Sequence, residues 1–264
     1  MRTEAQVKGK IWNREELIFA LSLYFQIPFG RLSALNKDVI RAAKLLNRTP
    51  ASVSMKLCNF ARFDPAHKAR QIKGLQHGSK MDGVIWNEFY NNWESLADAS
   101  LNVMHQFPIV DKQTDLLKSK EDAVKERKTE TKAEIKTRLG QDFFRGLVLS
   151  NFDYKCAITG IAVPGLLNAS HIIPWSQDET KRLNPSNGLC LNAIHDRAFD
   201  KGYITLDEDL RLIVGEDIRK EANRNPVLKR CFTIYEGKRI ATPERFELNL
   251  QAVEYHRTEV FECL

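Results

Sequence analysis

The stretch from residue 167 to residue 200 constrains the fold of this chain most. Its first part predicts a strand over residues 166–173 that carries His171. After a polar loop, Asn187 and a glycine open a second apolar run, which predicts a partner strand. A short helix that carries Asp196 is expected directly afterwards. Two strands and a helix in this order would bring an imidazole, an amide and a carboxylate close together.

These side chains suit phosphodiester hydrolysis, which needs a base for water and a cation for the leaving oxygen. His171 suits the base, because its pKa lies near neutrality and a strand end can hold its ring. Asp196 is the expected first ligand of a hard cation such as Mg²⁺, which prefers oxygen donors. His195 is expected as a second ligand or a phosphate contact, while Asp200 would either ligate or anchor the next loop. Asn187 is expected to pin the long loop to the strand.

Basic side chains in the same stretch are candidates for holding phosphate, namely Arg197 in the helix and Lys181 and Arg182 in the loop. Each residue of the stretch also has an ordinary structural role open to it. A single histidine in a strand is usually structural, an Asn-Gly pair is usually a turn, and helical carboxylates often form ion pairs. The combination of all of them is what favours a site.

Composition limits the class of protein. The chain has 264 residues and is 43% apolar, which suits one large or two medium globular domains. No apolar run is long enough to span a membrane, and the first residues lack the apolar core of a secretory signal. The five cysteines are scattered, so neither a disulfide framework nor a structural zinc is expected, and a cytoplasmic protein is the simplest expectation. A net charge of +6 permits a nucleic-acid partner without demonstrating one.

The first hundred residues predict a bundle of helices. Asn13 opens a capping-box pattern, and Asn36 and Thr49 are expected to cap the next two helices. The short turn between the second and third helices suits a helix-turn-helix, whose second helix would contact DNA. The expected contacts are Ser52, Lys56 and Asn59 on the outer face, with Arg62 just beyond. A plain helical hairpin explains this pattern equally well.

A change of composition separates two domains. Residues 111–138 are dense in Lys, Glu, Asp and Thr and contain neither Gly nor Pro, which predicts a solvated helix or linker. An aromatic helix around residues 81–97 is expected to be core. A hairpin over residues 203–214, a strand over 231–235 and a closing helix over 250–261 are expected near the end.

The predicted organisation is therefore α+β. An α-helical domain with a helix-turn-helix-like part would occupy residues 1–108, a charged linker 109–138, and a mixed domain 139–264.

The central stretch resembles the HNH endonucleases, whose ββα-metal fold takes its name from a His, an Asn and a second His. The matching segments are Ala169–Trp175, Asn184–Leu191 and His195–Gly202. The resemblance covers about residues 143–261. It implies that His171 is the general base and that Asn187 has a supporting role. It also implies that Asp196 and His195 form the metal end, with Mg²⁺ or else Mn²⁺ as the ion.

One departure from the family concerns the residue before the base. Many relatives carry a ligating Asp or His there, whereas this chain has Ser170, which would shift metal binding toward the helix. The paired zinc-knuckle cysteines of some members are also missing.

The N-terminal part is similar to the leading domain of bacterial HNH restriction endonucleases. Together the two resemblances imply a metal-dependent endonuclease that cuts double-stranded DNA in restriction or anti-phage defence. A homodimer on DNA is expected, because cutting both strands with one active site per chain usually needs two chains. Two alternatives stay open: a DNA-binding regulator with an inert HNH domain, which Ser170 keeps open, and a toxin-like nuclease without sequence preference.

Overall fold

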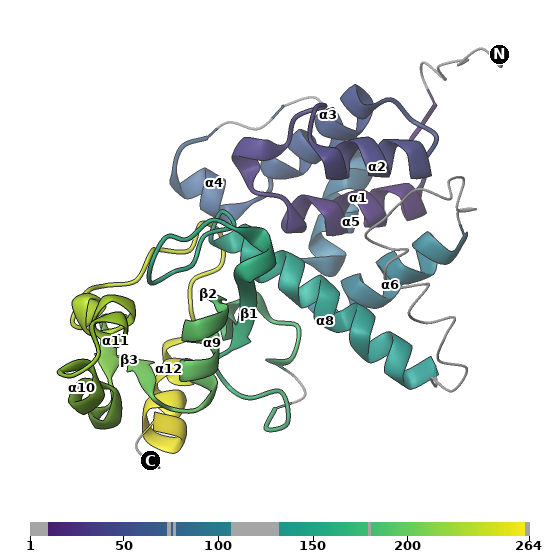
Figure 1. Cartoon of the computed structure of the whole chain (residues 1–264). Helices are drawn as coiled ribbons and strands as arrows, with labels where there is room; N and C mark the ends of the chain where they lie inside the picture. The colour runs from purple at the N-terminus through teal and green to yellow at the C-terminus, as the bar shows by residue number, and fades with distance from the viewer. Residues whose placement is uncertain (1–9, 73–74, 76–77, 107–131, 179–180, 262–264) are drawn as a thin grey trace, which may run out of the picture. The chain divides into compact units, whose positions relative to one another are not determined.

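A computed structural model describes residues 10–72, 75, 78–106, 132–178 and 181–261 (Figure 1). The chain divides into two compact units, Met1–Phe143 and Phe144–Leu264. The boundary falls inside a helix, and most of the expected linker over residues 109–138 lies outside the described residues, so that boundary stays a prediction. None of the helices in the described ranges is long and apolar enough to cross a membrane.

The described part of the first unit is helical. Its elements are α1 (Arg14–Gln26), the 3₁₀ turn η1 (Phe29–Arg31), α2 (Lys37–Leu45), α3 (Pro50–Ala61), α4 (Pro65–Ala69), α5 (Lys80–Phe89) and α6 (Trp93–Gln106). The predicted caps are confirmed: the side chains of Asn13, Asn36 and Thr49 each accept a backbone N–H at the start of α1, α2 and α3. Each cap satisfies a donor that the helix itself leaves unpaired.

Aromatic side chains form the core of the first unit. Phe25 of α1 lies with its ring centroid 5.3 Å from Trp86 of α5 and 5.1 Å from Trp93 of α6. Both tryptophans are buried, which confirms the prediction that this aromatic stripe is core. The single helix expected over residues 81–97 is wrong, because the stripe is divided between α5 and α6. Such pairs add about 0.5–1.5 kcal/mol each to the burial of the rings. The helices α2 and α3 pack against each other, but a helix-turn-helix function for them stays a prediction.

The second unit combines helices with two small sheets. Its elements are the remainder of α8 (Lys132–Asn151), η2 (Pro164–Leu166), β1 (Leu167–His171), η4 (Pro185–Asn187), β2 (Gly188–Asn192), α9 (Ala193–Asp200), β3 (Ile204–Leu206), β4 (Leu212–Val214), α10 (Glu216–Ala222), α11 (Pro226–Cys231), η5 (Thr233–Tyr235), α12 (Leu250–Tyr255) and the π-helical turn η6 (His256–Phe261). The expected hairpin over residues 203–214 is confirmed as β3–β4. The strand expected over residues 231–235 is wrong, because this segment ends α11 and continues as a 3₁₀ turn.

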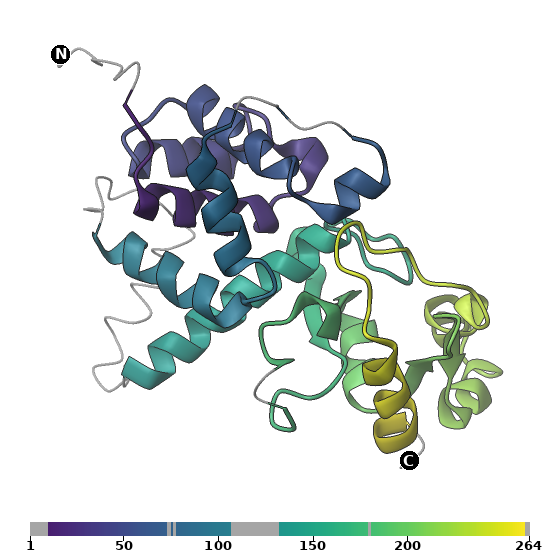
Figure 2. The same ribbon diagram turned by 180° about the vertical axis from the view of Figure 1, so that it is seen from behind.

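The strands β1 and β2 form an antiparallel hairpin, with Leu167 paired to Asn192 and His171 paired to Gly188. The helix α9 follows β2 directly and packs against β1, as Figure 1 shows from the front and Figure 2 from behind. The order strand, strand, helix agrees with the prediction for this stretch.

The helix α8 packs closely on the hairpin at Gly188. A Cβ atom at this glycine would lie 2.3 Å from Cγ2 of Val148 and 2.8 Å from Cζ of Phe144. Distances of this size are far below van der Waals contact, so only glycine fits opposite His171. The turn signal of Asn187-Gly188 is therefore also a packing requirement.

Candidate active site

His171 is the last residue of β1, and its ring is held between two aromatic side chains. It stacks on Phe144 at a centroid distance of 3.9 Å and an interplanar angle of 10°, and Trp175 lies edge-on at 5.3 Å. Its Nε2 atom lies 2.9 Å from the carbonyl oxygen of Arg182. Because a carbonyl only accepts, Nε2 must carry the proton and Nδ1 keeps its lone pair. No hydrogen bond from a described residue occupies Nδ1.

The surroundings keep this ring neutral. Burial lowers the pKa of His171, while the bond to the Arg182 carbonyl and the negative charge of Asp196 act in the opposite direction. The net shift is downward, so the imidazole is unprotonated at neutral pH and can accept a proton.

The buried Asn187 fixes the loop that supplies this carbonyl. Its Oδ1 accepts the N–H of Ile173 at 2.8 Å, and its Nδ2 donates to the carbonyls of Ile173 at 3.2 Å and Lys181 at 3.4 Å. The loop is thereby pinned to the end of β1, which is the supporting role expected for this side chain. Asn187 therefore acts on the site through the backbone of the loop.

The loop cations expected to hold phosphate are engaged within the loop. Arg182 donates from Nε to the carbonyl of Trp175 at 3.0 Å, and its guanidinium lies 5.2 Å from the centre of that ring. Lys181 forms an ion pair with Asp178 at 3.0 Å. Arg197 of α9 is exposed. Phosphate binding by these three cations stays a prediction.

Four oxygen-bearing side chains lie between β1 and α9. Asn168 donates from Nδ2 to Oδ2 of Asp196 at 2.6 Å. The hydroxyl of Ser170 is buried and lies beside Asp200, yet its oxygen has no partner with regular hydrogen-bond geometry. Burial and the charge of Asp196 raise the pKa of Asp200 more than its basic neighbours and Ser170 lower it. Two carboxylates one helical turn apart thus repel each other here.

Asn168 was not predicted as a site residue, although a signal for it exists in the sequence. Alternate residues of a strand face the same side, so Asn168 and Ser170 share the face on which α9 packs. A polar residue two positions before the serine is therefore placed to meet the acidic helix.

His195 has a contact at each of its ring nitrogens. Its Nδ1 lies 3.0 Å from Oδ1 of Asn192, and its Nε2 lies 2.8 Å from the carbonyl oxygen of Cys231. The ring is buried against Phe232 and Tyr235, and burial lowers its pKa. Both contact atoms are hydrogen-bond acceptors, so the neutral ring donates from one nitrogen only, and the shorter contact assigns that proton to Nε2. The bond to Cys231 joins α9 to the end of α11, while Nδ1 lies against Oδ1 of Asn192, the cap of α9. A role of His195 as metal ligand or phosphate contact stays a prediction.

Residues 156–207 match a family model described as HNH endonuclease. This segment is an HNH endonuclease domain. A solved structure described as "Modification dependent TagI restriction endonuclease" is similar to the chain with a TM-score of 0.34 and 19% sequence identity. The match covers 44% of this chain and 37% of that one, so this chain spans well under half of that protein. No curated protein matches the chain.

The residues of the HNH domain fit a hard divalent cation better than zinc. No group of three or more His, Cys, Asp or Glu side chains in the described ranges could hold a metal ion. The available donors are oxygens: the carboxylates of Asp196 and Asp200 and the hydroxyl of Ser170. A hard cation prefers oxygen and keeps several waters, and it would stabilise both the repelling carboxylates and the unpartnered hydroxyl.

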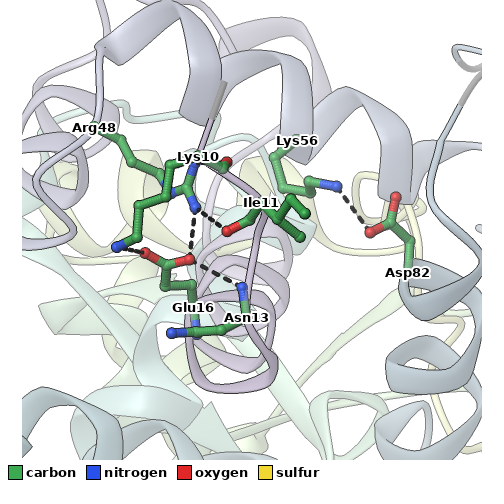
Figure 3. Close-up of polar contacts among 7 residues, drawn as sticks. All are labelled: Lys10, Ile11, Asn13, Glu16, Arg48, Lys56 and Asp82. Carbon is green, nitrogen blue, oxygen red and sulfur yellow. Dashed lines mark hydrogen bonds and ion pairs between the residues drawn. The ribbon is translucent and has the colours of Figure 1, made fainter. Parts of the chain in front are cut away.

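In the first unit, Lys56 corrects the predicted DNA contacts. Its ammonium is buried and lies 2.8 Å from Oδ1 of Asp82 (Figure 3). The other carboxylate oxygen of Asp82 accepts the N–H of Ser79. This pairing fixes α3 to the start of α5, so Lys56 is not displayed to solvent. Its periodic position on α3 suggested an outer face because the partner lies far away in the sequence.

The other expected DNA contacts of the first unit remain open. Ser52 and Asn59 are half-buried on α3. Arg62 donates to the carbonyl of Ser79 at 3.1 Å and lies over the ring of Phe63 at 4.4 Å. A contact of these three residues with DNA stays a prediction.

Proposed function

We propose that the chain is a divalent-metal-dependent endonuclease that hydrolyses DNA, with His171 as its general base. The observation that carries this proposal is the state of that imidazole within the HNH domain. One nitrogen is tied to the Arg182 carbonyl, the other is left with its lone pair, and the pKa is lowered. A general base needs this combination of a fixed ring and an available nitrogen.

In the proposed reaction, Nδ1 of His171 takes a proton from a water molecule that attacks the phosphorus. Asp196 and Asp200, with the hydroxyl of Ser170, would hold Mg²⁺ or Mn²⁺. When bound, the ion supplies stabilisation of the negative charge on the phosphate and on the leaving 3′ oxygen. Phe144 and Trp175 hold the imidazole plane, so that the base does not rotate away from the water.

The proposal extends to substrate and role. Double-stranded DNA is the proposed substrate, and because one active site cuts one strand at a time, two chains would act together as a homodimer. A restriction or anti-phage role rests on the sequence resemblance of the N-terminal part to bacterial restriction endonucleases. The half-buried residues Ser52, Asn59 and Arg62 are kept as candidate DNA contacts, with Arg197, Lys181 and Arg182 as candidate phosphate contacts.

The test is cleavage of supercoiled plasmid by the intact chain with Mg²⁺, with and without a chelator, compared with His171→Ala. Loss of general-base catalysis should slow cleavage by about 10²–10⁴-fold. Added imidazole should restore part of the activity of His171→Ala, because the substitution leaves a flat gap beside Phe144. A contaminating nuclease would show neither the loss nor the recovery.

Other outcomes would favour the alternatives. Equal cleavage by both proteins would refute the assignment of His171. Metal-independent binding of duplex DNA without nicking under Mg²⁺ or Mn²⁺ would indicate a regulator with an inert HNH domain. A smear from a long DNA substrate, in place of discrete fragments, would indicate a nuclease without sequence preference.

A further inference from the structure

Asn168 makes a contact that neither the HNH sequence pattern nor the proposed catalytic roles require. It lies in β1 opposite Leu191, and its Nδ2 donates to Oδ2 of Asp196 at 2.6 Å. The bond crosses from the strand to the helix α9, between residues 28 positions apart in the sequence. A hydrogen bond to an ionised acceptor is shorter and stronger than one between neutral groups, which agrees with this distance.

We propose that Asn168 is a positioning residue that orients the carboxylate of Asp196 for the divalent ion. The bond occupies Oδ2 and leaves Oδ1 of Asp196 as the oxygen without a hydrogen bond in the described part of the chain. This inference rests on the proposed function, since it assigns a role toward the ion that the HNH domain would use. Asn168 itself does not have to touch the ion or the DNA.

The need for such a residue follows from the charge of the site. Asp196 and Asp200 lie one turn apart on α9, so their like charges repel each other when no cation lies between them. Repulsion would favour side-chain rotamers of Asp196 that point away from Asp200. A donor on the neighbouring strand opposes that rotation and partly compensates the charge of Asp196. Losing an outer partner of a metal-binding carboxylate typically weakens metal affinity by about 10–100-fold.

Position 170 adds a second reason. The strand residue directly before His171 is Ser170, whose buried neutral hydroxyl is a weaker ligand for a metal ion than a carboxylate. With a weaker strand ligand, the affinity of the site depends more on the orientation of Asp196. Asn168 lies on the same strand face as Ser170, so β1 contributes to the metal site through a hydrogen bond to the helix.

The experiment measures Mn²⁺ binding to the intact chain by calorimetry, together with the Mn²⁺ dependence of plasmid cleavage. The variants are Asn168→Ala and Asn168→Leu, the second of which keeps the side-chain volume if the first does not fold. The matched control is Asn225→Ala, because Asn225 also uses its side chain in one hydrogen bond, to the N–H of Val227 at the start of α11. All three variants are expected to lower the melting temperature by a similar small amount.

If Asn168 positions Asp196, both Asn168 variants weaken Mn²⁺ binding by about 10–100-fold, while Asn225→Ala binds like the unmodified chain. Cleavage by the Asn168 variants then needs more Mn²⁺ but approaches the unmodified maximal rate at saturation. In an Asp196→Asn background, Asn168→Ala has no further effect on the residual cleavage rate, because the two residues act as one unit.

The inference is overturned if the Asn168 variants bind Mn²⁺ as the unmodified chain does, or if they lose maximal rate without a shift in Mn²⁺ dependence. Either result would give the bond a purely structural role. Failure of the unmodified chain to cut DNA would refute the proposed nuclease instead. The calorimetric comparison would still decide the role of Asn168 in that case.

Discussion

The two units of the chain differ in how completely their polar and charged side chains are paired. In the first unit, the carboxylates of Glu16 and Asp82 are fully buried, and each is paired with a cation (Figure 3). Each of the two carboxylates also accepts a backbone N–H. Between β1 and α9 of the HNH domain, the carboxylates repel each other and the Ser170 hydroxyl has no regular partner. A closed network stabilises a fold, whereas an open one keeps binding capacity for a ligand.

The histidines of the second unit show the same contrast. His256 is buried with both ring nitrogens hydrogen-bonded: Nε2 donates to the carbonyl of Phe199, and Nδ1 accepts from the hydroxyl of Thr205. His171 has Nε2 bonded and keeps the lone pair of Nδ1. The available lone pair therefore separates the candidate base His171 from the structural His256, although both have lowered pKa values.

The largest effect on stability should come from opening the closed network. Lys56→Ala leaves Asp82 as a buried carboxylate without its cation. Breaking a buried pair in this way costs about 3–5 kcal/mol of unfolding free energy, which urea denaturation followed by circular dichroism would measure. The double variant Lys56→Met with Asp82→Asn should recover most of the loss. If Lys56→Ala is as stable as the unmodified chain, the pair is not a closed structural network.

Lowering the pH should reduce the unfolding free energy of the second unit, because His256 becomes protonated. Burial, partly offset by the bond to the Phe199 carbonyl, lowers the pKa of His256 from 6.5 to about 4. Between these values the unfolded chain binds the proton and the folded chain does not, so stability is lost as pH falls from 6.5 toward 4. The loss is about 3 kcal/mol from this residue. Urea midpoints at pH 7 and pH 5 for the unmodified chain and His256→Gln would measure it, and an equal pH dependence in both would contradict it.

An intermediate effect is expected for His195→Ala. The substitution removes the bond to the Cys231 carbonyl and leaves a cavity beside Phe232, which should cost about 2–3 kcal/mol. Mn²⁺ affinity measured below the unfolding transition should stay unchanged, because Nε2 is bonded to the Cys231 carbonyl and Nδ1 lies against Oδ1 of Asn192. A large loss of Mn²⁺ affinity in a well-folded His195→Ala protein would identify this histidine as a ligand.

The smallest change in unfolding free energy is expected for Asp200→Asn, and this substitution should stabilise the chain where the others destabilise it. The pKa of Asp200 is raised, so its charged form is disfavoured in the folded chain and lowers stability at pH values above that pKa. Removing the charge should leave stability unchanged or raise it slightly, while Mn²⁺ binding weakens. Thermal unfolding at pH 7.5 in the presence of a chelator measures the first effect. A clear destabilisation would show that Asp200, like Glu16 and Asp82, is a carboxylate whose partners stabilise the fold.

Local signals made much of the fold predictable. The caps at Asn13, Asn36 and Thr49 act within a few residues, and the hairpin and helix of the HNH domain follow from periodicity and an Asn-Gly turn. The segment over residues 231–235 was mispredicted because its conformation depends on distant partners. Its Phe232 is buried, and the Cys231 carbonyl bonds to His195.

For the candidate site as well, the sequence predicted the features set by local spacing but not the contacts between distant residues. The pattern places His171, Asn187 and Asp196 on the right elements, because their spacing reflects the hairpin and the helix. It did not show that Lys56 turns inward or that Nε2 of His195 bonds to the Cys231 carbonyl, since both outcomes depend on residues 26 and 36 positions away. Nor did it single out Asn168, whose partner Asp196 lies on a different element.

The central claim is that Nδ1 of His171 is the base, and single-turnover cleavage rates measured against pH at saturating Mg²⁺ test it most directly. The rate of the unmodified chain should rise with pH and level off at an apparent pKa below 6.5, because the ring must be unprotonated and its pKa is lowered. His171→Ala should retain a rate lower by about 10²–10⁴-fold without that rising limb. The same limb in His171→Ala, or an undiminished rate, would contradict the claim.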